Sequence, residues 1–219
     1  MKKVLLWILP AVTVLSLLPG CAASREIYYN AWSKVGQDRR DIFVSRVKSA
    51  RGAENDAKED FRTTLEKFQD IAGAKGDMQL ETKYKKLQAS YDSCKARADK
   101  VTDKIQAVEN VANSMWAEWA KENTQFSDPA KKAENEKLLG ETKLKYEKLL
   151  GSMRSSETKM KPVLAKFNDV VLDLKHKLDA SAVASLQGTA VQIDTDVKSL
   201  IKDMEANIAE ADDFIKNMK

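Results

Sequence analysis

Few residues in this 219-residue sequence could do acid-base, nucleophilic or metal chemistry. His176 is the only histidine, so neither a multi-histidine metal site nor a Ser-His-Asp triad can be assembled. It lies at a predicted helix C-terminus, where positive charge suits the helix dipole. The sequence contains no Gly-x-x-x-x-Gly-Lys-Ser/Thr phosphate loop and no Gly-x-Ser-x-Gly elbow. We therefore expect no enzyme activity, no metal site and no cofactor.

The two cysteines have different surroundings. Cys94 falls on an apolar helical seam, as expected of a small buried hydrophobic residue. Cys21 ends a stretch that begins with Lys2 and Lys3 and continues with an apolar run over residues 4–18, which is typical of a signal peptide. The run is shorter than the ~20 residues that a membrane-spanning helix needs. We predict a removable signal peptide over residues 1–20.

Leu18-Pro19-Gly20-Cys21 resembles the lipobox of bacterial lipoproteins. The resemblance implies cleavage before Cys21 and acylation of its thiol and new amino group, and several acyl chains anchor a protein far more firmly than one. Ala22 stands where aspartate would redirect sorting in Gram-negative bacteria, which implies the periplasmic face of the outer membrane. The alternative is an ordinary secreted protein cut near Ala22 or Ala23.

The charge balance argues against nucleic-acid binding. The chain has 37 Lys and Arg against 33 Asp and Glu, and removal of Lys2 and Lys3 leaves 35 against 33, a net charge of +2. After Cys21, the remaining thiol belongs to Cys94, so no intrachain disulfide is expected in an oxidising compartment.

Heptad spacing of apolar residues predicts an all-α fold, an elongated antiparallel bundle of four long helices with coiled-coil packing, preceded by a signal-peptide helix. We expect one domain over residues 21–219, with helices at about 24–72, 78–122, 129–176 and 181–217. Two of the series are Thr142, Tyr146, Leu149, Met153, Ser156, Met160, Val163, Phe167, Val170, Leu174 and Val183, Leu186, Ala190, Ile193, Val197, Leu200, Met204, Ile208. Such seams can close within one chain or between chains.

Antiparallel pairing of the first two helices brings aromatic residues together at the end nearest Cys21. Trp32 falls opposite Trp116 and Trp119, with Tyr28 close by. The cluster is either an aromatic plug that closes one end of the bundle or a docking patch at the membrane surface.

A basic stretch of the first helix follows this aromatic end. It comprises Lys34, Arg39, Arg40, Arg46, Lys48 and Arg51, with Asp38 and Asp41 among them. The stretch is a solvated face, a match to acidic residues of another helix, or a contact for anionic headgroups. In the last two helices, the third is basic over residues 131–161 and the fourth acidic over 194–219, so complementary charge should help to set their register. Gly188 is expected near Phe167 and would make room for its ring.

Three segments together resemble a bacterial family of predicted helical lipoproteins catalogued as a domain of unknown function. They are Tyr28-Tyr29-Asn30-Ala31-Trp32 with Lys34-Val35-Gly36 and Arg39-Arg40-Asp41-Ile42, residues 146–163, and residues 174–188. The resemblance implies a lipoprotein with one helical domain. It implies no activity, substrate or catalytic residue.

Two functional hypotheses follow. The first is a lipid-anchored periplasmic protein without enzyme activity, a structural or adaptor element at the outer membrane that contacts a protein partner or itself through its helices. The second is a membrane-surface or lipid-interacting module that uses the basic stretch and the aromatic end.

Overall fold

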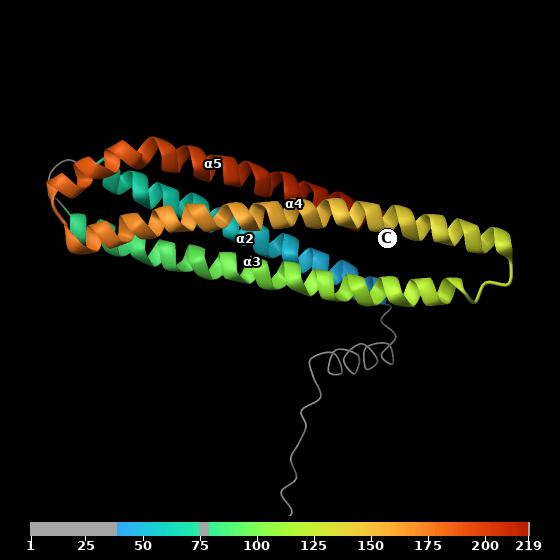
Figure 1. Cartoon of the computed structure of the whole chain (residues 1–219). Coiled ribbons are helices and arrows are strands. Elements are labelled where there is room, and N and C mark those ends of the chain that lie inside the picture. The colour runs from blue at the N-terminus through green and yellow to red at the C-terminus, as the bar shows by residue number, and fades with distance from the viewer. Residues whose placement is uncertain (1–38, 75–78, 219) are drawn as a thin grey trace, which may run out of the picture. The chain divides into compact units, whose positions relative to one another are not determined.

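The computed structural model describes residues 39–74 and 79–218, and in these ranges the chain forms four α-helices and no strand (Figure 1). The helices are α2 (Arg39–Ala72), α3 (Leu80–Asn123), α4 (Pro129–His176) and α5 (Ala180–Asn217). Their 34, 44, 48 and 38 residues correspond to lengths of about 50 to 70 Å. The predicted all-α bundle of four long helices is confirmed. The predicted signal-peptide helix lies outside the described residues.

Aspartate residues that cap the first helical turn explain where α4 and α5 begin. The Asp128 side chain accepts hydrogen bonds from the backbone N–H groups of Ala130 and Lys131, and Pro129 occupies the first helical position of α4. Asp179 caps α5 in the same way, at 2.9 Å from the backbone nitrogen of Ala182. Pro129 and His176, the observed ends of α4, coincide with the ends predicted from the sequence.

The four helices form a closed square. Helix α2 packs against α3 and α5, and α4 packs against the same two helices, so α2 and α4 face each other across the core. Aromatic contacts join this diagonal, with ring centroids 5.7 Å apart for Phe43 and Tyr146 and 6.4 Å apart for Phe68 and Phe167. In Figure 1 the α3–α4 end projects beyond the start of α2 and the end of α5.

The heptad positions predict the core well, but two predicted core positions of α5, Ala190 and Ile208, are only half-buried. All ten positions of the series from Thr142 to Leu174 are buried. In the last series the prediction placed Ile208 in the core, but Asn207 and Ala211 are buried and Ile208 is half-exposed. The prediction chose Ile208 because its side chain is apolar. The alternating heptad steps of three and four residues from Met204 instead place Asn207 and Ala211 in the core.

Complementary charge does line the contact between α4 and α5. Lys148 and Lys159 of α4 pair with Glu210 and Asp203 of α5 at 2.8 and 2.6 Å. The prediction that Gly188 makes room for Phe167 is wrong, because a Cβ atom built on Gly188 would meet no atom within 4 Å. The two ion pairs show that α5 is shifted along α4 by about one helical turn from the register that would place Gly188 beside Phe167.

Candidate functional site

The aromatic end contains five rings from all four helices. Phe43 is fully buried and lies 5.8 Å from Trp116 and 5.7 Å from both Tyr146 and Phe214, measured between ring centroids. Trp119 stacks on Trp116 at 6.3 Å, and its indole N–H donates to Asn135 Oδ1 at 2.7 Å. These side chains therefore pack the inside of the bundle. Edge-to-face rings of this kind stabilise a core beyond the area that they bury.

Part of the basic stretch is paired with acidic residues of neighbouring helices. Arg39 forms an ion pair with Glu118 of α3, and Arg51 donates to Asp212 of α5 at 2.8 Å. Arg40 is exposed and Arg46 half-buried on the same helix. Lys34, Tyr28 and Trp32, and the predicted lipidation site Cys21, lie outside the described residues.

The middle of the bundle holds a set of polar groups that runs from the core, at Glu54, Ser156 and Asn207, to the half-buried Arg154 and the exposed Gln106, and we call this set the polar layer. It comprises Glu54, Gln106, Glu109, Ser152, Arg154, Ser156, Glu157 and Asn207. Two sets of contacts divide it. The Glu54 site joins Glu54, Ser156 and Asn207, and the Arg154 site joins Arg154, Gln106, Glu109 and Glu157.

The Glu54 site is an acid in the core without a basic partner. Glu54 is fully buried, and the Asn207 side-chain amide donates to Ser156 Oγ at 2.6 Å and to Glu54 Oε1 at 3.4 Å. Glu54 Oε2 has no hydrogen-bond partner among the described residues. Burial raises the pKa of Glu54 to about 8, against a smaller lowering by the Asn207 hydrogen bond. The carboxyl group is therefore mainly protonated at neutral pH.

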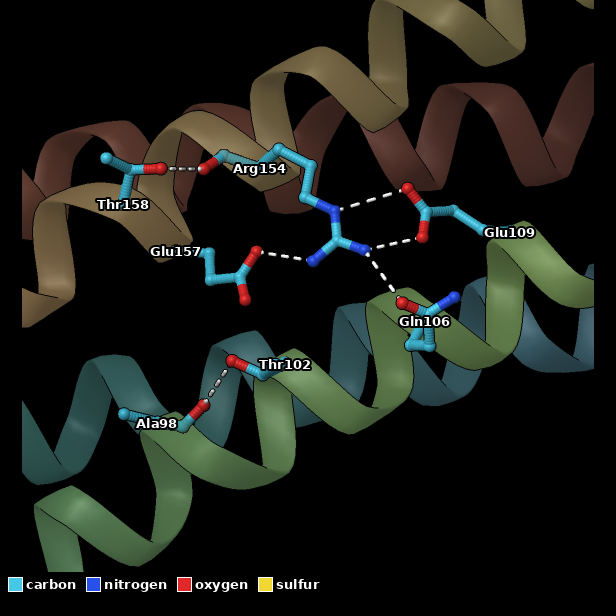
Figure 2. Close-up of polar contacts among 7 residues, drawn as sticks. All are labelled: Ala98, Thr102, Gln106, Glu109, Arg154, Glu157 and Thr158. Carbon is cyan, nitrogen blue, oxygen red and sulfur yellow. Dashed lines mark hydrogen bonds and ion pairs between the residues drawn. The ribbon is translucent and has the colours of Figure 1, made fainter.

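The Arg154 site holds its carboxylates around a cation (Figure 2). The Arg154 guanidinium donates to both carboxylate oxygens of Glu109 at 3.2 and 2.5 Å, and to Glu157 at 2.6 Å. Burial opposes ionisation of Glu157, but hydrogen bonds from Arg154 and Thr102 and the charges of Arg154 and Lys161 lower its pKa below the ordinary value. The hydrogen bond to Glu109 is the largest cause of a raised Arg154 pKa. This bidentate geometry ties α3 to α4.

The remaining candidates are structural in their surroundings. Cys94 is fully buried, and burial raises the pKa of its thiol to about 12, so the reactive thiolate is suppressed. His176 is exposed in the last turn of α4. Residues 39–74 and 79–218 contain no group of three His, Cys, Asp or Glu side chains that could hold a metal ion. None of the helices within these ranges is both long enough and apolar enough to cross a membrane.

Sequence reasoning did not single out the polar layer. A signal was present, because Glu54 stands at the heptad step between Ala50 and Ala57, where the apolar series has a gap. Asn207 stands at the equivalent step after Met204. A polar residue at a single core position of a heptad seam is a known means of setting register.

The similarity of the chain to known proteins lies at the level of a protein family. No curated protein and no solved structure matches the chain. A family model described as a protein of unknown function, DUF2959, matches residues 28–218. This range includes all four described helices and both parts of the polar layer, and the chain therefore belongs to that family of proteins of unknown function.

Proposed function

We propose that the protein is a non-enzymatic, lipid-anchored helical bundle that acts as a structural or adaptor element on the periplasmic face of the outer membrane. In this proposal residues 1–20 are removed and Cys21 carries the acyl chains. The helices bind a protein partner or a second copy of the chain, and not nucleic acid. The lipobox-like sequence before Cys21 and the residue Ala22 support the anchor and its membrane.

One observation supports the adaptor role, namely that several of the described residues offered for membrane contact pair or pack with neighbouring helices of the bundle. Arg39 and Arg51 pair with Glu118 and Asp212. Trp116 is buried among the rings of Phe43, Trp119 and Tyr146, which come from α2, α3 and α4. A bundle whose charged and aromatic residues join its own helices is suited to act as a stiff spacer, whereas insertion into a lipid surface would separate these contacts.

The anchor is tested by comparing full-length protein with a Cys21→Ser variant in a Gram-negative host. Mass spectrometry of the mature N-terminus should find acyl chains on Cys21, and density-gradient fractionation should place the wild-type protein with the outer membrane. The variant should lack acylation and lose that distribution. An unacylated mature chain that begins near Ala22 would instead indicate an ordinary secreted protein.

The choice between an adaptor and a membrane-surface module is tested with vesicles. The unacylated chain from Ala22 to Lys219 should not co-sediment with anionic vesicles at low salt. Salt-sensitive binding to anionic but not neutral vesicles would favour the membrane-surface hypothesis. Arg40→Ala would then be the first variant to measure, with Lys85→Ala of α3 as a control for loss of one exposed charge.

A further inference from the structure

A shallow groove follows the seam between α4 and α5. Three hollows of about 450, 290 and 180 Å³ succeed one another along it, from the level of Lys148 to that of Val170. Small or uncharged residues such as Ser155, Pro162 and Ser199 line them. The groove therefore extends over more than twenty residues of α4 and is open to a partner along its length.

The two rims of this groove carry opposite charges. They are bridged by the pairs of Lys148 with Glu210, Lys159 with Asp203 and Lys166 with Asp196. The basic member always lies on α4 and the acidic member on α5. The Lys148 and Lys159 side chains remain 78% and 51% exposed, so their ammonium groups have donors left for a second carboxylate.

The glycine that lines the largest hollow, Gly151, has no packing role inside the chain. A Cβ atom on Gly151 would meet nothing within 4 Å, although glycine weakens a helix relative to alanine. Leu144 and Leu172 repeat the heptad position of Gly151 and are 67% and 44% exposed. Leu144 and Leu172 therefore lie near the two ends of the groove, and Gly151 lines its largest hollow.

We propose that the α4–α5 face is the interface of a homodimer in which two copies pack in parallel, related by a twofold axis that runs along the helices. This axis places α4 of each copy over α5 of the other, so each basic rim meets an acidic rim at the same level. A twofold axis across the helices would place α4 on α4 and oppose lysine to lysine. Charge complementarity thus selects both the partner and its direction.

The size of the face is sufficient for a stable dimer. The seam between Lys148 and Val170 is roughly 33 Å long, and two helices side by side are roughly 20 Å wide. Both copies together would bury about 1,300 Å², which lies within the range of specific protein interfaces. The inference goes beyond the anchored bundle proposed above and does not depend on acylation, since the anchor contributes no residue to this face.

The interface is tested with Gly151→Glu and a matched control, Gly140→Glu. Both glycines lie in α4 with open space around a Cβ atom, but Gly140 shares the heptad position of Arg154, which faces α3. Sedimentation equilibrium of the full-length protein in mild detergent should find a dimer for the wild type and for Gly140→Glu. Gly151→Glu should weaken the dimer at least tenfold, with unchanged helical circular dichroism and, at concentrations where both proteins are monomeric, no loss of thermal stability.

We expect a dissociation constant in the low-micromolar range. A wild-type protein that is still monomeric at about 100 µM would therefore overturn the proposal. Equal weakening by both glutamate variants would overturn the assignment to this face. A variant with Lys148→Glu, Glu210→Lys, Lys159→Asp and Asp203→Lys keeps its internal pairs with reversed sign. Mixed with differently tagged wild-type protein, it should form several-fold fewer mixed dimers than random exchange gives, and random exchange would overturn the parallel orientation.

Discussion

The Glu54 site and the Arg154 site both hold a glutamate within one bundle, Glu54 fully buried and Glu157 9% exposed, with opposite consequences for its ionisation. Glu54 is buried opposite an amide and a hydroxyl group, and its pKa rises to about 8. Glu157 is also buried, but the Arg154 guanidinium beside it lowers its pKa. The charge of the partner, rather than burial alone, decides whether a core carboxyl group is neutral or ionised.

The difference has a direct consequence for stability. A neutral carboxyl group in the core retains its place only while it holds a proton, whereas an ion pair holds the bundle only while both partners are charged. The Glu54 site should therefore control the response of the bundle to rising pH, and the Arg154 site its response to acid.

The largest effect is expected for Glu54→Gln. Folding raises the pKa of Glu54 from its ordinary value of 4.5 to about 8, so the folded chain keeps a proton that the unfolded chain loses. The free energy of unfolding should fall as pH rises between these values, by roughly 3 to 5 kcal/mol. Glu54→Gln should remove this loss. Urea unfolding from pH 4.5 to 9 measures the effect, with Glu66→Gln, at an exposed position of the same helix, as control. If the free energy of unfolding changed between pH 5 and pH 8 by the same amount in the wild type and in Glu54→Gln, the prediction would be wrong.

Arg154→Leu should have the next largest effect. It leaves Glu109 and Glu157 together without their cation. Because the Arg154 side chain is 32% exposed, the cost should lie below that of a fully buried pair, at about 2 to 3 kcal/mol. Chemical unfolding at pH 7 measures the loss. Arg62→Leu is the matched control, because Arg62 also bridges two glutamates, but these are 48% and 53% exposed against 24% and 11% for Glu109 and Glu157, and it should cost less than about 1 kcal/mol. Equal costs would mean that depth does not distinguish the two sites.

Asn207→Ala should sharpen the comparison further. The substitution removes the hydrogen bonds to Ser156, to the Ser152 carbonyl and to Glu54, at a cost of about 1 to 3 kcal/mol. Because the Asn207 amide lowers the pKa of Glu54, its loss should move the alkaline decline in stability to higher pH. A double-mutant cycle with Glu54→Gln measures this coupling, and strict additivity would show that the two side chains act independently.

Much of the fold was predictable from local periodicity. The heptad series of α4 identified every one of its ten positions as buried, and Asp128 with Pro129 identified where that helix begins. These are signals within one helix. The register between helices is not, because the short connections set it only to within about a turn, and this explains the misplaced Gly188.

The polar layer was less accessible to prediction for the same reason. A sequence shows that Glu54 interrupts an apolar series, but the identity of its partner depends on the register of α5 against α2. Likewise, Arg154 reads as an exposed residue of α4 until α3 places Gln106 and Glu109 within reach of it. Partners that lie 45 or more residues apart come only from the packed bundle.

Glu157→Gln should have the smallest effect and tests the acid side of the comparison. Since folding lowers the pKa of Glu157, the ionised form contributes stability above its ordinary value of 4.5, and this is lost as pH falls through the folded value. The variant should cost about 1 kcal/mol at pH 7 and show a shallower loss of stability below about pH 4.5. Glu54→Gln is the internal control, because Glu54 is protonated in both the folded and the unfolded chain at such pH and its substitution should leave the acid loss unchanged. The prediction would be wrong if Glu54→Gln changed the loss of stability at low pH, or if Glu157→Gln changed the loss of stability at high pH.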